Sequence, residues 1–448
     1  MTVTMTLARL NLTHLFAGLG VVALSVPSLP AQAQWFTYSG PYQGRGALTG
    51  TNGNKAVVDA AGTLHMVAEE NGHIFYRTSS NGVAISPPVS IGAVAGAGSP
   101  AIAIDRSGNL AVIFEADAAA TCPTLYYVYR AAGASTWSSP LAYARGLEPS
   151  MVGGSNATTR TLFVACDGTT QQQRGVHYGE FSTTAPAAWT HVSPNAIADY
   201  PESACAPVRE RWSKPSIGVV TLNQPWGLFD RVFTGWGRYI DLSSPSCQQT
   251  GGTLTNDPVA APHQLAVYLG DYTFESPGEG FPFGYGRHVF QSPTAPARTE
   301  LISSSLAVDA NENGLLVYSA DFGGERGAWF GVALPDGWGV LSHSPLTPHP
   351  SIVDVAASPA APETFRFAYN PELQWGSPYS VVFRADLTFQ RRFLWLSNLQ
   401  LTVSPQSAWG GREAQALYWT RANCEYYNLM DRFVSGAGYR VQLSRTCW

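Results

Sequence analysis

The segment from Asp271 to His288 combines carboxylates, aromatic rings, an arginine and a histidine within eighteen residues. Aromatic faces beside carboxylates and a guanidinium suit sugar rings, whose C–H faces stack while their hydroxyls form hydrogen bonds. We therefore take His288 as a candidate catalytic residue, and Tyr285 and Arg287 as candidate substrate-binding residues. Because neighbouring residues on a strand point to opposite faces, Arg287 and His288 cooperate only if they lie in a loop. The alternative is a Gly/Pro-rich loop whose rings pack against the body of the protein.

A second set of polar residues lies in the longer loops between predicted strands. Charged residues make up only 13% of the chain, yet they gather in these loops. Function tends to be carried by loops that a rigid scaffold holds in place. The candidate catalytic residues here are Glu115, Asp321 and Glu325, and the candidate substrate-binding residues are Arg174, Arg326 and Trp375. The remaining polar residues of the set are Glu69, Glu70, Asp117, Asp167, Glu372 and Gln374. The alternative is that these side chains are only solvated.

Two reactions fit these residues. Glycoside hydrolysis needs an acid and a nucleophile or base on either side of the scissile bond. Elimination at a uronate needs a base such as His or Tyr, and a cation that neutralises the substrate carboxylate. The sequence does not reveal which two groups converge. Three interpretations therefore remain open: a glycoside hydrolase, a polysaccharide lyase, and a non-catalytic lectin or surface-interaction module.

The element that holds these loops is a repeated hairpin. A short β run, an Asp, a turn with Gly and a second apolar run recur at 56–69, 101–114 and 305–320. Turns such as Asn71-Gly72 between alternating apolar runs are strong hairpin signals. Hairpins that recur about every 40–50 residues are typical of β-propeller blades.

We therefore predict an all-β protein, a β-propeller of four-stranded blades whose strands we letter A to D from the centre outward. Seven blades are expected, with six and eight as alternatives, and strands from the two termini close the ring. Residues 34–448 form one domain with an insertion near 190–214. A pair of β-sandwiches is the rival architecture. The innermost strands are expected to start near Ala56, Ala101, Ser150, Ser216, Gln264, Ser305 and Ser351, four of them after a proline.

This architecture sorts the loops into two ends. The A–B and C–D turns lie at one end of every blade, which we call the A–B end. The B–C loops and the D-to-A connections lie at the other, the B–C end. The polar loops of the second set are B–C loops, so the B–C end is the expected site.

The cysteines indicate an oxidising compartment and structural disulfides. Six cysteines allow fifteen pairings. Cys122 ends the second B–C loop and Cys166 begins the third, which favours that pair. The others lie in the insertion, late in the fourth blade and in the closing segment: Cys205, Cys247, Cys424 and Cys447. None has zinc-finger spacing, so we expect no metal site there.

The N-terminal segment and the net charge of the chain indicate where the protein is located and which partners it binds. Residues 1–33 read as a signal peptide, with an apolar run at 15–26 and a small-x-small site at 31–33, so we expect a secreted or periplasmic protein. No segment is long and apolar enough to predict a membrane span. A net charge of −5 without long charged runs argues against nucleic acid. We expect a monomer without cofactor, with Ca²⁺ at the Asp-rich turns as the alternative. The only two lysines, Lys55 and Lys214, receive no functional role.

The repeats at 101–114 and 305–320 resemble those of the BNR and sialidase-like β-propeller superfamily. Sialidase Asp-boxes follow S-x-D-x-G-x-x-W, whereas here the spacing from Asp to Gly is longer and the final Trp is missing after Asp59, Asp105 and Asp309. Members of this superfamily include glycosidases, polysaccharide lyases and lectins. The resemblance implies a polysaccharide or glycan partner without selecting the reaction.

Overall fold

The computed structural model describes residues 34–37, 53–80, 84–117, 120–167, 173–185, 191–199, 210–241, 263–271, 288–291, 301–321, 326–334, 339–341, 347–348, 350–357, 363–371, 381–390, 393–403, 413–421, 424–434 and 438–447. Every regular element in these ranges is a β-strand, which confirms the all-β prediction. The same ranges contain no helix of the length and hydropathy that crossing a membrane requires.

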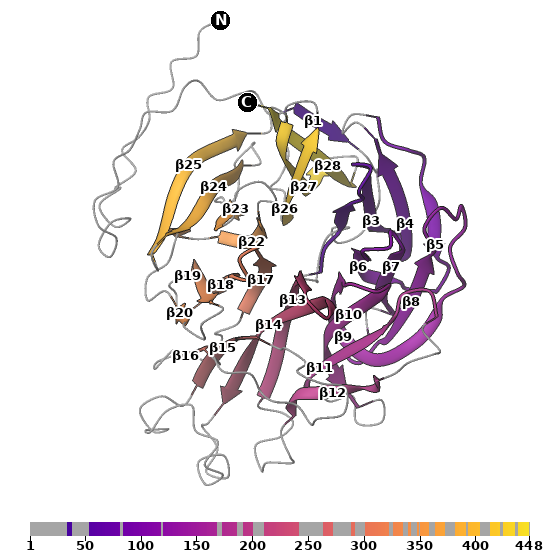
Figure 1. Ribbon diagram of the computed structural model, residues 1–448, viewed down its shortest axis with the longest axis horizontal. Helices are drawn as coiled ribbons and strands as arrows, with labels where there is room; N and C mark the ends of the chain where they lie inside the picture. The colour runs from indigo at the N-terminus through magenta and orange to yellow at the C-terminus, as the bar shows by residue number, and fades with distance from the viewer. Residues whose placement is uncertain are drawn as a thin grey trace, which may run out of the picture.

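The first half of the chain forms antiparallel meanders in chain order (Figure 1). The first sheet contains β2 (Ala56–Val58), β3 (Leu64–Glu70), β4 (His73–Ser79) and β5 (Val89–Gly92). The second contains β6 (Gly98–Ile104), β7 (Leu110–Ala116), β8 (Thr124–Arg130), β9 (Leu141–Gly153), β10 (Thr158–Cys166), β11 (Gln173–Ser182) and β12 (His191–Asp199). β9 serves two meanders, because residues 141–145 pair with β8 and residues 146–153 pair with β10.

The second half repeats the pattern. One sheet contains β13 (Glu210–Gln224), β14 (Gly227–Asp241), β15 (His263–Asp271) and β16 (His288–Gln291). The next contains β17 (Leu301–Val308), β18 (Gly314–Asp321), β19 (Arg326–Ala333) and β20 (Gly339–Leu341), with β21 (Thr347–Pro348) also paired to β19. A further sheet contains β22 (Pro350–Ala357), β23 (Thr364–Pro371), β24 (Val381–Gln390) and β25 (Phe393–Val403).

The last sheet joins the two ends of the described chain. It contains β26 (Glu413–Arg421), β27 (Cys424–Val434), β28 (Gly438–Cys447) and β1 (Gln34–Thr37). β1 pairs antiparallel with β28, with Gln34 opposite Arg445. Figure 1 shows the sheets set around a common centre, with the first strand of each meander nearest to it. These inner strands contact one another in chain order, and β26 contacts β2. This is a propeller arrangement.

The repeated Asp of the sequence fastens the A–B turns. Asp59, Asp105 and Asp309 each accept a hydrogen bond through Oδ1 from the backbone N–H four residues later, at 2.7, 2.9 and 2.8 Å. Asp105 and Asp309 also accept the side-chain amide of the Asn at that position, at 2.8 Å in both turns. A carboxylate that binds its own turn in this way favours a tight hairpin. The repeat is therefore a folding signal, formed by local contacts.

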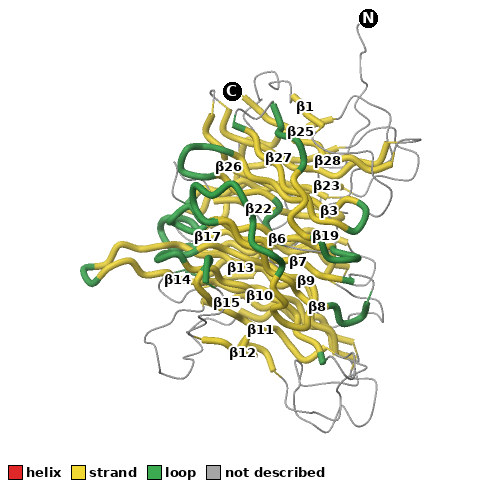
Figure 2. The backbone as a smooth tube through the Cα atoms, turned by 90° about the vertical axis from the view of Figure 1, so that its right-hand side faces the viewer, coloured by secondary structure: helices red, strands yellow, loops and turns green. Residues whose placement is uncertain are grey.

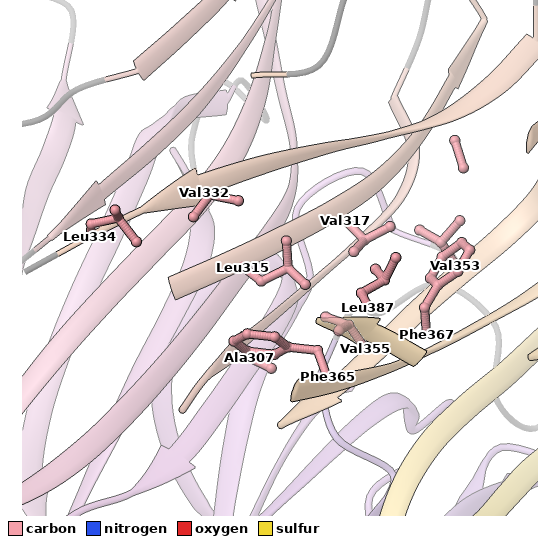
Figure 3. Packing of buried hydrophobic residues seen from close by; sticks show 11 residues of the cluster. Ala307, Leu315, Val317, Val332, Leu334, Val353, Val355, Phe365, Phe367 and Leu387 are labelled. Atoms are coloured by element: carbon pink, nitrogen blue, oxygen red, sulfur yellow. The ribbon is translucent and has the colours of Figure 1, made fainter. Parts of the chain in front are cut away.

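Apolar side chains from neighbouring sheets fill the space between them. Between the sheet of β17–β20 and the sheet of β22–β25, Leu315 and Val317 lie on one side and Val353, Phe365 and Leu387 on the other (Figure 3). Equivalent clusters separate the earlier meanders. Packing of sheet on sheet buries both faces of each sheet, so the sequences of the strands are nearly continuous apolar runs.

One expected inner strand is misplaced in the prediction. The segment at Gln264 belongs to β15, which is the third strand of its sheet and lies between β14 and β16. Its apolar run resembles an inner strand because both are buried, and the burial pattern alone does not give the position of a strand in its sheet. Strands occupy much of the predicted insertion near 190–214. β12 covers 191–199, and β13 begins at Glu210.

Candidate functional site

The inner strands share a local distortion near the B–C end. The register shifts between Gly98 and Ala101 in β6, between Leu147 and Ser150 in β9 and between Ser213 and Ser216 in β13. β17 and β22 have a shift near their first residues as well. Bulges of this kind are enriched beside active sites, where they redirect side chains.

Three bulges hold a non-glycine residue in the left-handed region just before a proline. The φ angles are 51° at Ser99, 52° at Glu148 and 54° at Lys214. Proline follows each of them, at positions 100, 149 and 215. Such backbone angles are uncommon and unfavourable, and they cluster at functional sites. The same strain at the same point of three inner strands marks the B–C end as the candidate site.

These strained residues are linked across neighbouring inner strands. The Glu148 backbone N–H donates to Glu115 Oε1 at 2.6 Å. The Glu148 carboxylate accepts the Lys214 backbone N–H at 2.6 Å and forms an ion pair with Lys214 Nζ. Ser304 Oγ then donates to the Lys214 carbonyl at 2.6 Å. One hydrogen-bonded chain thus runs from β7 through β9 and β13 to β17. We call Glu115, Glu148 and Lys214 the central cluster.

Both lysines of the chain belong to this region. Lys55, which directly precedes β2, is 3% exposed and its Nζ donates to the Pro100 carbonyl. Its charge acts on Glu115 and also on Glu69 at the end of β3. The sequence analysis gave the two lysines no functional role, and the structure places both of them at the B–C end.

Glu115 has the environment of a proton donor. Only 6% of the residue is exposed, and this burial raises the pKa of its carboxyl to about 7. The Glu148 charge acts in the same direction, whereas the hydrogen bonds from Glu148 and Ser99 and the charge of Lys55 oppose it. Burial also raises the pKa of Glu69. A carboxyl that stays protonated near neutral pH beside an ion-paired carboxylate is the arrangement that acid–base catalysis uses.

Four of the candidates in the B–C loops lie near strand ends that the structure describes. Glu115 is near the end of β7, and Asp321 at the end of β18 is paired in register with Arg326 at the start of β19. Arg174 is the second residue of β11. The Glu70 carboxylate is bound by Arg77 at 2.5 Å. Among the members of this set that the structure describes, Glu115 is the one that joins the central cluster, and the catalytic roles assigned to the set remain predictions.

The other large candidate segment is divided by the strand order. His288 begins β16 and lies opposite Leu269 of β15. Consecutive antiparallel strands reverse direction, so the connection from β15 to β16 lies at the same end as the turn from β13 to β14. His288 therefore sits at the A–B end, away from the central cluster. Tyr285, Arg287, Glu325 and Trp375 lie outside the described residues.

The predicted disulfide between neighbouring B–C loops is confirmed. Cys122 and Cys166 are joined by a disulfide, with their Cα atoms 5.9 Å apart and a separation of 44 positions in the sequence. Their bond links the loop after β7 to the end of β10, beside the central cluster. Cys424 and Cys447 are register partners in β27 and β28, and their bond remains a prediction. Cys205 and Cys247 lie outside the described residues.

The A–B end carries buried polar groups that join blades. His65 Nδ1 lies 2.6 Å from Tyr76 Oη and its Nε2 lies 3.1 Å from Asp59, while Arg130 donates to Tyr76 Oη at 2.8 Å. Burial lowers the pKa of His65 and raises that of Tyr76 to about 12. His65 is only 5% exposed, so it lies inside the fold.

A second such group is centred on Asp230. It accepts Arg160 Nη1 at 2.6 Å and the Ser155 backbone N–H at 2.7 Å, and Arg160 also contacts Glu180 at 3.0 Å. Among the described residues, no three His, Cys, Asp or Glu side chains are grouped as a metal site requires.

Comparison with known proteins gives a likeness of fold. No protein-family profile matches the sequence and no curated protein matches it, so the BNR resemblance stays a prediction. Among solved structures, a PL25 ulvan lyase bound to -[GlcA(1-4)Rha3S]- has a TM-score of 0.60 at 10% identity, over 90% of this chain and 94% of that chain. The same kind of lyase without that ligand has a TM-score of 0.58 at 10% identity, over 89% and 94%. The polysaccharide lyase Uly1 has a TM-score of 0.52 at 11% identity, over 91% and 92%.

Proposed function

We propose that this chain is an exported β-propeller that binds a polysaccharide at the B–C end and cleaves it there. The observation that carries the proposal is the central cluster, in which buried Glu115 is bonded to the ion pair of Glu148 and Lys214 on strained inner strands. The similar fold of the ulvan lyase and of Uly1 supports a polysaccharide as the substrate class.

The proposal includes the finer architecture. Counting β9 in two meanders, the strand pairings support seven four-stranded blades. The pairing of β1 with β28, and the contact of β26 with β2, support a ring closed by both termini.

Elimination at a uronate is the reaction that the central cluster favours. The base removes the proton beside the substrate carboxylate, the bond to the leaving sugar oxygen breaks and a carbon–carbon double bond forms. Glu148 is the proposed base, and protonated Glu115 the donor to the leaving oxygen. The Lys214 side chain is 17% exposed and can pair with the substrate carboxylate. Asp321 and Arg326 at the same end remain candidates for binding the flanking sugars.

Glycoside hydrolysis is the second candidate, because two carboxyl groups in different environments also suit an acid and its partner carboxylate. The lectin alternative differs from both reactions in giving no product.

A panel of neutral and uronate-containing polysaccharides tests the proposal. Purified protein is incubated with each, and new reducing ends and the absorbance of unsaturated uronate are followed. Both signals together indicate a lyase, and reducing ends alone a hydrolase. Retention on a glycan column without product indicates a lectin. The proposal is contradicted if the protein neither forms product from any of the polysaccharides nor is retained by any of them.

Variants then assign the product to the central cluster. Glu115→Gln is expected to lower the rate at least about 100-fold, because removal of a general acid typically costs that much. Lys214→Met should lower the rate as well, because it removes the cation proposed to pair with the substrate carboxylate. Glu312→Gln removes a carboxylate from an ion pair with Arg231 at the A–B end, and is the matched control that should retain the rate.

A further inference from the structure

The hairpin of β13 and β14 is longer than its neighbours and extends beyond the body of the protein. Each of its strands has fifteen residues, and the pairing continues to Gln224 opposite Gly227. Only Pro225 and Trp226 form the turn. Figure 2 shows the hairpin projecting past the other loops, with its turn at the free end. The tip is therefore the A–B turn of its sheet, at the end opposite to the central cluster.

Trp226 is displayed at this tip. It is 79% exposed, compared with 49% for Val89 and 41% for Leu141, the other large apolar side chains that are exposed in the described ranges. A two-residue hairpin turn is usually made by small or polar residues such as Asn and Gly. A tryptophan here buries little of its surface, so the folded chain gains little from it. Its large apolar ring is instead available to a ligand.

The base of the hairpin is fixed on both sides, so the tip is presented rigidly. Asp230 of β14 accepts hydrogen bonds from Thr221 Oγ1 at 2.6 Å and from the Ser155 backbone at 2.7 Å. Arg231 forms an ion pair with Glu312, in the A–B turn of the next sheet. A rigid aromatic side chain binds with a small loss of conformational entropy.

The composition of the tip identifies the class of ligand. Residues 215–229 contain no charged side chain, which removes the usual attraction to anionic lipids. Asn223, which is exposed, and Gln224, which is partly exposed, are the amide residues that precede the turn of Pro225 and Trp226. An aromatic face beside neutral amides fits a sugar, whose C–H face stacks while its hydroxyls bond to amides.

We infer that Trp226 and its neighbouring amides form a second polysaccharide-binding site, which holds a distant part of the polymer, or another chain of it, at the A–B end. The choice of polysaccharide rests on the proposed function. The long hairpin separates this site from the central cluster, so it contributes to retention on polymer and leaves the chemical step unchanged.

The test compares Trp226→Ala, Trp226→Tyr and the control Leu141→Ala in the full protein. Retention is measured by affinity electrophoresis in gels that contain the polysaccharides of the panel. Trp226→Ala is expected to weaken retention about tenfold, the effect of losing one stacking interaction of ordinary strength. Trp226→Tyr should retain most of the binding, and Leu141→Ala all of it. On short oligosaccharides, kcat should be the same in all variants.

Failure of this inference is distinct from failure of the proposed function. If Trp226→Ala is retained like the wild type on every polysaccharide while the wild type still forms product, the second site is wrong and the proposed function stands. If the wild type forms no product but is retained through Trp226, the second site stands without the enzyme. Binding of the wild type to phosphatidylcholine–phosphatidylglycerol vesicles that is lost in Trp226→Ala, with no effect on polysaccharide, overturns the inference in favour of a membrane contact.

Discussion

Replacing Glu115 with glutamine should change how the stability of the protein depends on pH. Burial raises the pKa of this carboxyl from 4.5 to about 7 in the folded protein, so the folded state holds a proton that the unfolded state releases. The stabilising contribution is complete below pH 4.5 and is lost as the pH rises through about 7. One pKa unit corresponds to ~1.4 kcal/mol, so the loss is roughly 3 kcal/mol. Glutamine keeps a neutral side chain of the same shape and can still accept the Glu148 N–H.

The measurement is the free energy of unfolding in urea, followed by tryptophan fluorescence at several values between pH 5 and pH 8.5. Near pH 5, wild type and Glu115→Gln should be similar. Above pH 7.5 the variant should be more stable by roughly 3 kcal/mol. Glu312→Gln is the control, because it removes a carboxylate from a partly exposed ion pair. A difference between wild type and Glu115→Gln that does not change with pH would refute the argument, as would a variant that is less stable at high pH.

Three further outcomes test other parts of the fold. The double variant Cys122→Ser/Cys166→Ser opens a loop of 44 residues and should lower the unfolding free energy by about 4 kcal/mol, measured by urea titration without reductant. Asp230→Asn leaves the buried Arg160 charge with weaker compensation and should cost about 3–5 kcal/mol in the same titration, a prediction that a loss below about 1 kcal/mol would contradict. Burial lowers the pKa of His65, so its neutral form stabilises the fold above pH 6.5, and this contribution is lost as the pH falls. The stability advantage of wild type over His65→Gln, measured by thermal melting, should therefore shrink from pH 7 to pH 5.

The parts of the fold that depend on near neighbours could be predicted from the sequence. Asp59, Asp105 and Asp309 bind N–H groups four residues away, so the turn chemistry is visible in a short window. Asp321 and Arg326 are register partners across a hairpin that joins neighbouring strands, for the same reason. These contacts need only a few residues of chain, and propensity and spacing are sufficient to find them.

The place of a strand within its sheet could not be predicted from the sequence. Gln264 was assigned to an inner strand, because a buried third strand and a buried first strand have the same apolar pattern. The prolines after Ser99, Glu148 and Lys214 indicate strand starts, and they are the sequence signal for the strained residues that precede them.

The all-β class, the hairpin repeat and the preference for pairing Cys122 with Cys166 could be inferred from the sequence, since each follows from local turn chemistry or from a regular spacing. The meeting of Glu115, Glu148 and Lys214 could be recognised in the folded protein alone, because they are 33 and 66 positions apart in the sequence. Contacts across such distances in sequence depend on how whole sheets pack around a centre. The burial that gives Glu115 its raised pKa exists only once that packing has removed water from its carboxyl.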